Sequence, residues 1–285
     1  MSIMSVVCRR ADWADIPALL HVEYKTMPGH KYLAAVREKF LDPSQGVLLA
    51  AEVDGVVAGV AHLAFLSDGG SWFEVLRVTP DYQKRGCGTA MWAEAFKICE
   101  EKKLNSIRMY TGYKNVTSRK LAERFGLTLT CHTREGVLSL EDCPEEGTGA
   151  VKEFRRVTDP ERAAELASPY VENYGGYFCR NRTFWAMGPA LWSELVKHGS
   201  LYEKDGSIVD IGARMELHKG FQMGLVGGDI KACADLAKDM LVYTGLPAVT
   251  AMIPAADEAL KEGLEKEGFV FPDVSIIMLE KKFNW

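Results

Sequence analysis

A basic loop with two closely spaced glycines is the stretch of this sequence best suited to chemistry. It reads Gln83-Lys84-Arg85-Gly86-Cys87-Gly88-Thr89, between a β-type run ending at Val78 and a long amphipathic helix. Glycine adopts backbone angles denied to other residues, so Gly86 and Gly88 let consecutive N–H groups point into one concavity. The helix, expected to begin near Thr89, adds its unpaired amides and the positive end of its dipole. This order of parts predicts a pyrophosphate-binding site.

The glycine spacing separates this loop from two other phosphate-binding motifs. A Walker A loop ends in Gly-Lys-Ser/Thr, which this stretch lacks, and a Rossmann fingerprint needs a third glycine where Met91 stands. A surface turn before an ordinary helix is the remaining alternative. The pattern Gln-x-x-Gly-x-Gly after a strand ending in valine resembles the acyl-CoA signature of the GNAT acetyltransferase superfamily. The resemblance covers most of residues 5–140 in element order.

The resemblance implies acetyl-CoA, or another acyl-CoA, as the cofactor. Its pyrophosphate would be held by the Gln83 side chain and by the amides of the loop: Arg85, Gly86, Cys87, Gly88 and Thr89. Leu76 and Val78 would follow the pantetheine arm, because in this fold their strand splays from its neighbour and exposes unpaired backbone groups. A second motif, Asn115-x-x-Ser118, resembles the family's Asn-x-x-Ala helix and adds both residues to the cofactor contacts. Asn115 equally suits a helix cap or a turn.

The proton donor of the family is missing from its usual place. The family often has a tyrosine one position after the residue matching Leu121, where this sequence has Ala122. Tyr113, Tyr110 or a water molecule would then protonate the leaving thiolate, with Cys131 a weaker candidate. Of these candidates, Tyr113 is the proton donor that we predict.

The general base implied by the resemblance is Glu74, on the strand before the glycine loop. Acyl transfer to an amine requires the ammonium to lose a proton first, commonly to a carboxylate acting through water. Period-two alternation places Glu74, Leu76 and Val78 on one face of the strand, so Glu74 is expected to face the cleft. A solvated edge glutamate is the alternative. The amides of the same strand would stabilise the developing oxyanion, while the loop fixes the thioester.

The first half of the chain alternates strands and helices. A hairpin turn at Asp54-Gly55 joins two of the strands, and Asp12 and Gly126 mark a helix start and a helix end. The expected strands are 5–10, 47–53, 56–66, 72–78, 106–110, 127–131 and 136–140, and the expected helices are 12–26, 30–40, 89–102 and 117–125.

The second half repeats the first in outline. Arg9-Arg10 and a capped helix ending near Tyr24 are echoed by Arg155-Arg156 and a helix from Asp159 to Tyr170. The turn after Glu52 is echoed after Glu203, and the helix end at Gly126 is echoed at Gly268. Three echoes in the same order indicate a divergent duplication.

The duplication predicts a mixed α/β fold with two GNAT-like domains in tandem, each a mostly antiparallel central sheet flanked by helices. Residues 1–145 form the expected catalytic domain, residues 141–150 a linker, and residues 151–285 a degenerate domain that is structural or binds substrate. In the second half Gly227-Gly228-Asp229 leads almost directly into a helix. A tight strand-to-helix turn is therefore expected there, with a small anion nest as the alternative.

Composition excludes several classes of protein. The 285 residues are 47% hydrophobic and 26% charged, as in globular proteins, and the net charge of −5 argues against nucleic acid as the main partner. Neither a signal peptide nor a membrane span is expected. The seven cysteines and six histidines are scattered, which indicates reduced thiols in a cytoplasmic protein and no metal site. The oligomeric state is left open.

The leading functional hypothesis is an acetyl-CoA-dependent N-acetyltransferase acting on a small-molecule or peptide amine. The rival is a protein that binds or senses acyl-CoA without turnover, which Ala122 and the degenerate second copy favour. The aromatic, basic segment 174–182, with Phe184, Trp185 and Trp192 after it, either lines an acceptor cleft or belongs to a core.

Overall fold

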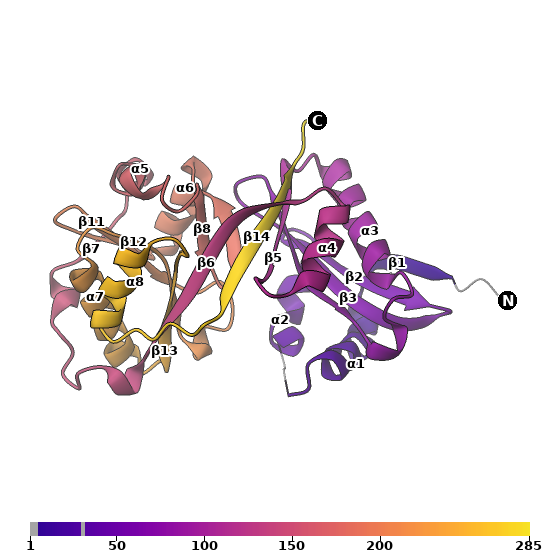
Figure 1. Cartoon of the computed structure of the whole chain (residues 1–285), viewed down its shortest axis with the longest axis horizontal. Coiled ribbons are helices and arrows are strands. Elements are labelled where there is room, and N and C mark those ends of the chain that lie inside the picture. Colours follow the sequence, from indigo (N-terminus) through magenta and orange to yellow (C-terminus); the bar gives the residue numbers. More distant parts are fainter. Residues whose placement is uncertain (1–4, 30–31) are drawn as a thin grey trace. The chain divides into compact units, whose positions relative to one another are not determined.

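The structure, a computed structural model, describes residues 5–29 and 32–285 and divides into two compact units (Figure 1). The first unit comprises Met1–Met109, Thr117–Thr128 and Leu279–Trp285, and the second comprises Tyr110–Val116 and Leu129–Met278. In the part of the chain that the structure describes, no helix has the length and apolar character needed to cross a membrane.

The sheet of the first unit is antiparallel over four strands. These are β1 (Val6–Arg10), β2 (Gly46–Val53), β3 (Val56–Phe65) and β4 (Ser71–Val78), and β5 (Ser106–Gly112) follows in parallel to β4. The expected hairpin between β2 and β3 is confirmed. Asp54 and Gly55 at its turn have φ angles of 50° and 82°, as a two-residue turn requires.

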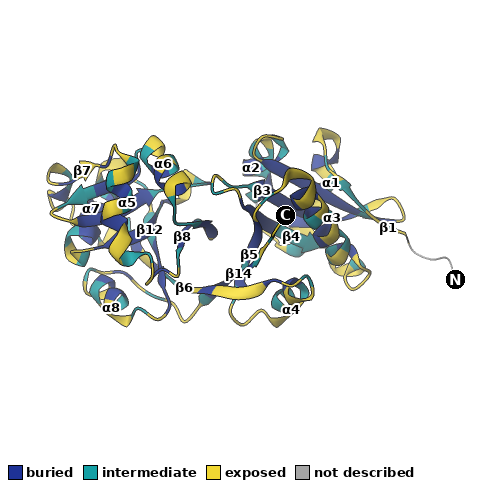
Figure 2. Cartoon of the chain, turned by 90° about the horizontal axis from the view of Figure 1, so that it is seen from above, coloured by how far each residue is buried: buried dark blue, intermediate teal, exposed yellow. Residues whose placement is uncertain are grey.

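Two pairs of helices cover the two faces of this sheet. On one face are α1 (Ile16–Thr26) and α2 (Tyr32–Leu41), with Phe40 of α2 stacked on His62 of β3. On the other is α3 (Cys87–Lys102), whose Trp92 packs on Phe73 and, at 5.5 Å, on Phe125 just after α4 (Val116–Arg124). Figure 2 shows the strands of this sheet largely buried between helices that have buried and exposed sides. His30, the expected start of the second helix, lies outside the described residues.

The second unit repeats this order of elements. Strands β7 (Arg155–Arg156), β10 (Leu201–Lys204), β11 (Ser207–Gly212) and β12 (Phe221–Gly227) pair antiparallel, and β13 (Ala248–Pro254) runs parallel to β12. Its helices are α5 (Pro160–Ala167), α6 (Pro189–His198), α7 (Ile230–Thr244) and α8 (Glu258–Lys266). The hairpin of β8 (Tyr177–Arg180) and β9 (Thr183–Ala186) forms a separate small sheet.

The echoes predicted from sequence are confirmed in backbone geometry. Asp205 and Gly206, between β10 and β11, have φ angles of 48° and 83°, close to those of the first hairpin turn. Asp159 caps α5, and Gly268 ends α8 with φ 96° where Gly126 ends α4 with φ 82°. These matches support a duplicated architecture.

The last strand of each half contributes residues to the unit built mainly from the other half. Strand β6 (Thr128–Ser139) pairs antiparallel with β13, from Ala248 opposite Ser139 to Pro254 opposite Thr133. Strand β14 (Ser275–Lys282) ends in the first unit, where Glu280 binds Arg108 of β5 at 2.7 Å. The division of the sequence at residues 145–151 therefore stays a prediction, and the compact units cross it.

The prediction of two strands over residues 127–140 is wrong, because β6 is continuous. The polar run from His132 to Glu135, which suggests a turn in sequence, stays in register with β13. Arg134 pairs with Glu258 at 2.8 Å, and both oxygens of Glu135 accept bonds from Arg182. These ion pairs satisfy polar side chains within the strand.

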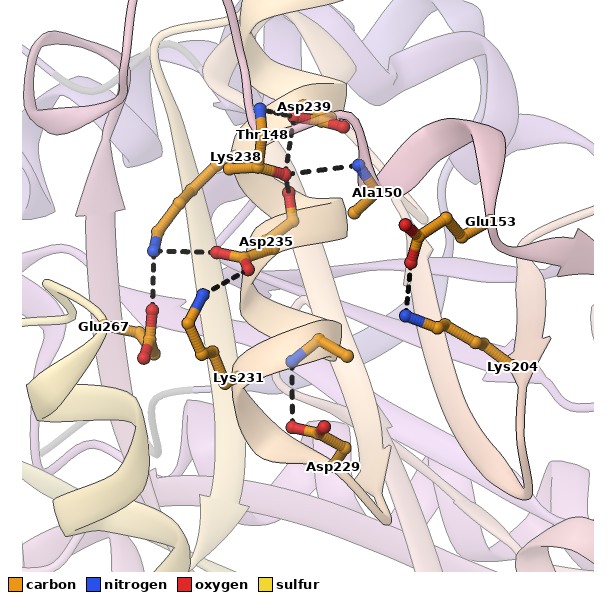
Figure 3. Close-up of polar contacts among 11 residues, drawn as sticks. Thr148, Ala150, Glu153, Lys204, Asp229, Lys231, Asp235, Lys238, Asp239 and Glu267 are labelled. Carbon is orange, nitrogen blue, oxygen red and sulfur yellow. Dashed lines mark hydrogen bonds and ion pairs between the residues drawn. The ribbon is translucent and has the colours of Figure 1, made fainter.

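The expected linker at 141–150 is fastened to α7 (Figure 3). Two short helical turns, Leu140–Asp142 and Ala150–Lys152, overlap its two ends. Asp239 of α7 accepts hydrogen bonds from the Thr148 hydroxyl at 3.0 Å and the Val151 amide at 2.9 Å. Lys238 on the same helix bonds both Asp235 and Glu267.

Candidate functional site

Strand β4 contains a bulge where it separates from β5. Its register with β3 passes from His62 opposite Glu74 to Val60 opposite Arg77, so two residues of β4 face one residue of β3. Val75 in the bulge has φ 62°, a left-handed conformation that is costly for a β-branched residue. The register of β4 with β5 covers Ser71 and Trp72. The strand therefore opens toward the glycine loop, as the family resemblance implies.

The bulge corrects the expected face of Glu74. Glu74 lies opposite His62, and Arg77 lies opposite Val60, two residues along the same strand. Glu74 and Arg77 therefore share the face covered by α1 and α2, and Val78, opposite Gly59, lies on the other. Simple alternation, which groups Glu74 with Val78, fails because the bulge adds a residue between them.

The glycine loop leads into an uncapped helix. Lys84 and Gly86 have φ angles of 62° and 98°, and α3 begins at Cys87, two residues earlier than expected. Its first backbone bond runs from Ala90 N to Gly86 O, so the amides of Cys87, Gly88 and Thr89 have no acceptor inside the helix. In the described chain no side chain caps this end. The geometry suits an anion.

The two glycines of the loop have different roles. Gly86 supplies the left-handed angle at the helix cap. Gly88 is helical, and the expectation that it needs unusual backbone angles is wrong. A Cβ on Gly88 would lie 3.2 Å from Leu121 Cδ2, so glycine there lets α3 approach α4 closely.

Donors and positive charge surround the same end of α3. Gln83, Lys84, Arg85 and Thr89 are exposed. The Arg85 guanidinium lies 5.1 Å from the centre of the Tyr82 ring, and Gln83 Nε2 donates to the Val78 carbonyl at 3.2 Å. Burial raises the pKa of the Cys87 thiol, so Cys87 contributes its amide and not a thiolate.

Glu74 is buried beside a histidine, so the alternative of a solvated edge glutamate is wrong. Its Oε1 lies 2.9 Å from His62 Nδ1, and both side chains are less than a tenth exposed. On the same face Arg77 pairs with Glu23 of α1, whose two oxygens accept from the Leu33 amide at 3.0 and 3.1 Å. Glu23 thus ties α1, the first turn of α2 and β4 together.

The residues of the second motif divide between the two units. Ser118, Leu121 and Ala122 belong to the first, and Ala122 is fully buried. Asn115 and Tyr113 belong to the second, where the Asn115 amide donates to the Gly112 carbonyl at 2.9 Å and closes a turn before α4. Their roles toward the cofactor stay predictions.

Tyr113, the candidate acid, is half exposed and stacks on His132 with centroids 4.9 Å apart. His132 Nε2 lies 2.8 Å from Ser275 Oγ. Burial, with a smaller effect of the Arg134 charge, lowers the pKa of His132, so its ring is neutral at pH 7. Cys131 is buried, and Tyr110 lies 5.8 Å below the Arg182 guanidinium.

The aromatic residues of segment 174–182, which are Tyr174, Tyr177 and Phe178, are buried, as the core alternative expected. Their neighbours Phe184, Trp185 and Trp192 are buried as well, and Arg180 forms a buried ion pair with Asp210. Arg182 is held by Glu135. Across residues 5–29 and 32–285, no three His, Cys, Asp or Glu side chains gather as a metal ligand set.

The comparisons with known proteins agree with this geometry. Residues 13–127 match the model of the acetyltransferase (GNAT) family. No curated protein sequence matches the chain. That region is therefore a GNAT-family acetyltransferase domain, of a family that typically uses acetyl-CoA, and the acetyl acceptor is not identified.

Solved structures match nearly the whole chain. A tandem GNAT protein of the clavulanic acid biosynthesis pathway has a TM-score of 0.59 at 13% identity, covering 98% of each chain. A GCN5-related N-acetyltransferase from Sphaerobacter thermophilus has 0.61 at 15%, covering 97% of this chain and 95% of its own. A glucosamine N-acetyltransferase region of a fungal multi-domain β-N-acetylglucosaminidase has 0.63 at 14%, covering 98% and 38%. The chain has the tandem GNAT fold.

Sequence reasoning missed His62, Glu23 and the bulge at Val75. His62 interrupts an apolar strand, and that was the available signal for a buried polar partner. Glu23 lies in an ordinary amphipathic helix and carried no signal. The bulge is visible only in the pairing of β4 with β3.

Proposed function

We propose that the protein is an acetyl-CoA-dependent N-acetyltransferase that transfers the acetyl group directly to a small-molecule or peptide amine in a ternary complex. One observation carries the proposal: the uncapped N-terminus of α3, with three amides lacking an acceptor inside the helix, follows a strand that opens from its neighbour. Phosphate binds well at such helix ends because both the amides and the dipole favour negative charge.

The residues present fit the cofactor. Gln83, Arg85 and the amides from Gly86 to Thr89 would hold the pyrophosphate, and the backbone of Leu76 and Val78 would follow the pantetheine arm. Asn115 and Ser118 complete the proposed contacts. When bound, acetyl-CoA supplies the acetyl group as a thioester.

The transfer needs a base and an acid. Glu74 would accept the proton of the acceptor ammonium, directly or through water, and the free amine nitrogen would then attack the thioester carbonyl. A C–N bond forms and the C–S bond breaks. Amides of β4 near the bulge would stabilise the oxyanion, and the Tyr113 hydroxyl would protonate the departing thiolate.

The alternative is a protein that binds acyl-CoA without turnover. Two observations favour it: Ala122 is buried and carries no proton, and the second half lacks the basic loop. Release of free CoA separates the two functions, because only an enzyme produces it in proportion to an acetylated amine.

The test has two steps. Melting temperatures are measured with acetyl-CoA, CoA, ATP and NAD, where a ligand at a hundred times its Kd adds about 2.7 kcal/mol of stability. Free thiol is then followed across amino sugars, polyamines, amino acids and peptide amines, amino sugars being the class that the name of the fungal region suggests.

The proposal expects a shift with the two CoA ligands and turnover that Glu74→Gln abolishes while acetyl-CoA affinity is kept. Tyr113→Phe retains the ring that stacks on His132 and is expected to lower kcat alone. A shift without turnover on any amine favours the binding protein, and no shift with either CoA ligand contradicts both functions.

A further inference from the structure

His62 is a polar residue in the middle of an otherwise apolar strand. It lies on β3 between Ala61 and Leu63, is 2% exposed, and faces Glu74 directly across the antiparallel pair. The 2.9 Å between its Nδ1 and Glu74 Oε1 is a hydrogen-bond distance. Burying two polar groups costs free energy unless they satisfy one another, so the pair must be kept together by its surroundings.

The imidazole ring is clamped on two sides. The ring of Phe40 stacks on it with centroids 3.8 Å apart and planes 7° apart. On β2, a Cβ at Gly46 would lie 2.6 Å from His62 Nε2 and 2.9 Å from its Cε1, so only glycine leaves room for the ring. Helix α2 and strand β2 thus fix the ring plane and, through Nδ1, the position of the Glu74 carboxylate.

The clamp stands directly before the strained part of β4. Glu74 is followed by Val75, the residue with left-handed backbone in the bulge. The regular alternation of β4 breaks at this point, and the contact with His62 on the adjacent strand orients the Glu74 carboxylate.

We propose that His62 is the positioning residue of the general base. It donates Nδ1–H to Glu74, which orients the carboxylate and favours its ionised form. The proton taken from the acceptor ammonium then resides on the buried Glu74–His62 pair, as a carboxylic acid beside imidazole or as a carboxylate beside imidazolium. This inference rests on the proposed function.

Two further charged side chains on this face pair with each other. Arg77 of β4 and Glu23 of α1 bind each other, and Glu23 also accepts from the Leu33 amide of α2. From β2 the ring meets Gly46 and from α2 it meets Phe40, neither of which titrates. The pH response that the experiment reads is that of the His62–Glu74 pair.

The experiment compares His62→Leu with His62→Asn in the full chain. Leucine removes the donor, whereas the asparagine amide places an N–H near the position of Nδ1. We expect His62→Leu to lower kcat about tenfold or more and to move the acidic limb of the kcat–pH profile to higher pH, because the carboxylate loses a bond to its charged form. His62→Asn is expected to restore most of kcat and the original limb, with KM for acetyl-CoA unchanged in both.

A residue with a structural role alone would lower the melting temperature of His62→Leu and leave the limb in place, and that result overturns the inference. Equal losses in the leucine and asparagine variants also overturn it.

A second measurement requires no substrate. In protein labelled with ¹⁵N-histidine, we expect the His62 resonances of the Nδ1–H tautomer in the wild type and a changed signal in Glu74→Gln. An Nε2–H tautomer that is indifferent to residue 74 overturns the pairing. If no amine is acetylated but the tautomer is as expected, the proposed function has failed, and the positioning role fails with it while the pair itself stands.

Discussion

Two corresponding strand-to-helix junctions, β4 to α3 and β12 to α7, have the same plan and opposite outcomes. In the first half, β4 ends at Val78 and α3 begins at Cys87, after a basic loop. In the second, β12 ends at Gly227 and α7 begins at Ile230. Asp229 caps α7 by accepting from the Ala232 amide at 3.0 Å (Figure 3), and its own amide donates to Ser207 Oγ. A side-chain carboxylate thus occupies the helix end that would otherwise attract phosphate.

The strands before the two helices also differ, because in β12 a side chain binds the backbone at the position that corresponds to Val78 of β4. Both carry a bulge, and the second residue in register after it is Val78 in β4 and Val226 in β12. The Val226 amide donates to the Tyr174 hydroxyl at 3.0 Å, and that hydroxyl donates to the Val226 carbonyl at 3.4 Å. Strand β12 also stays paired with β13 as far as Met223, which is the first residue of its bulge. Strand β4, by contrast, is in register with β5 at Ser71 and Trp72, before its bulge.

Aromatic side chains complete the closure of the second junction. A Cβ on Gly224 would lie 2.3 Å from Phe178, and one on Gly227 would lie 2.3 Å from Tyr170. Burial raises the pKa of Tyr174, which therefore remains a neutral hydroxyl. The comparison shows that in the second half the chain's own side chains occupy the helix end and bind the strand backbone, without loss of the fold.

The largest effect is expected from the two glycines of positive φ that precede α3 and α7, Gly86 and Gly228. Gly228 has φ 87°, and an added Cβ would lie 2.7 Å from Ser207 Cα, so Gly228→Ala should cost about 3 kcal/mol of unfolding free energy through backbone strain and overpacking. Gly86 has φ 98°, and among the described residues an added Cβ would meet Val6 Cγ2 at 3.9 Å, so Gly86→Ala should cost about 1 kcal/mol. Urea unfolding measures both, and equal costs would break the contrast between a closed and an open junction.

The next effect concerns ligand binding. Thr89 is exposed at the third position of α3, where a carboxylate is favourable for the helix but lies where phosphate would bind. Thr89→Glu should weaken acetyl-CoA binding on the order of a hundredfold through charge repulsion, measured by titration calorimetry.

The matched control is Ala232→Glu, which places a glutamate at the third position of α7. We expect it to leave the affinity for acetyl-CoA unchanged. An equal loss in both variants, or none in Thr89→Glu with the fold retained, would refute binding at α3.

A smaller effect is expected from Tyr174→Phe. It leaves the buried N–H and C=O of Val226 without the hydroxyl that bonds both, at a cost of about 2 kcal/mol. The measurement is the urea midpoint, and acetyl-CoA affinity should not change. Tyr243→Phe serves as the control because Tyr243 is 82% exposed. Equal midpoints for the two variants would show that the hydroxyl does not hold the second junction.

The smallest effect concerns the pH dependence of stability and compares an arginine ion pair near the start of each half. In the first half Arg9 bonds Asp15 and Glu52, whereas in the second Arg162 bonds Glu203. The hydrogen bond from Arg9 lowers the pKa of Asp15. A carboxyl with a lowered pKa adds stability above its unfolded pKa of about 3.9, which is lost as pH falls through the folded pKa.

Asp15→Asn should therefore reduce stability at pH 7 and flatten its decline below pH 4, as urea midpoints from pH 3 to 7 would show. An unchanged slope below pH 4 would mean that Asp15 contributes no pH-dependent stability.

Much of the fold could be predicted because turns and caps are encoded locally. Asp54-Gly55, Asp205-Gly206, Asp12, Asp159, Gly126 and Gly268 all mark the boundaries that the structure has. The glycine loop could be found in the same way, since its spacing, its charge and the helix after it are contiguous.

The features that could not be predicted depend on pairing between distant segments. The bulge at Val75 exists only relative to β3, and without it the face of Glu74 is misjudged. The continuity of β6 depends on β13, more than a hundred residues later, and on Arg182 and Glu258 as partners for its charges. The local hydrophobic periodicity of a segment does not reveal which distant segment will pair with it.

The exchange of final strands has a consequence for synthesis. Arg108 of β5 pairs with Asp68 of the first half at 2.6 Å, but its second carboxylate partner, Glu280, lies 172 residues later in the sequence. While the ribosome makes the second half, the first carries an incomplete sheet edge, the kind of surface that recruits foreign strands. Contacts of this sequence separation also slow folding. We therefore expect the nascent first half to mature late and to depend on chaperones until β14 emerges.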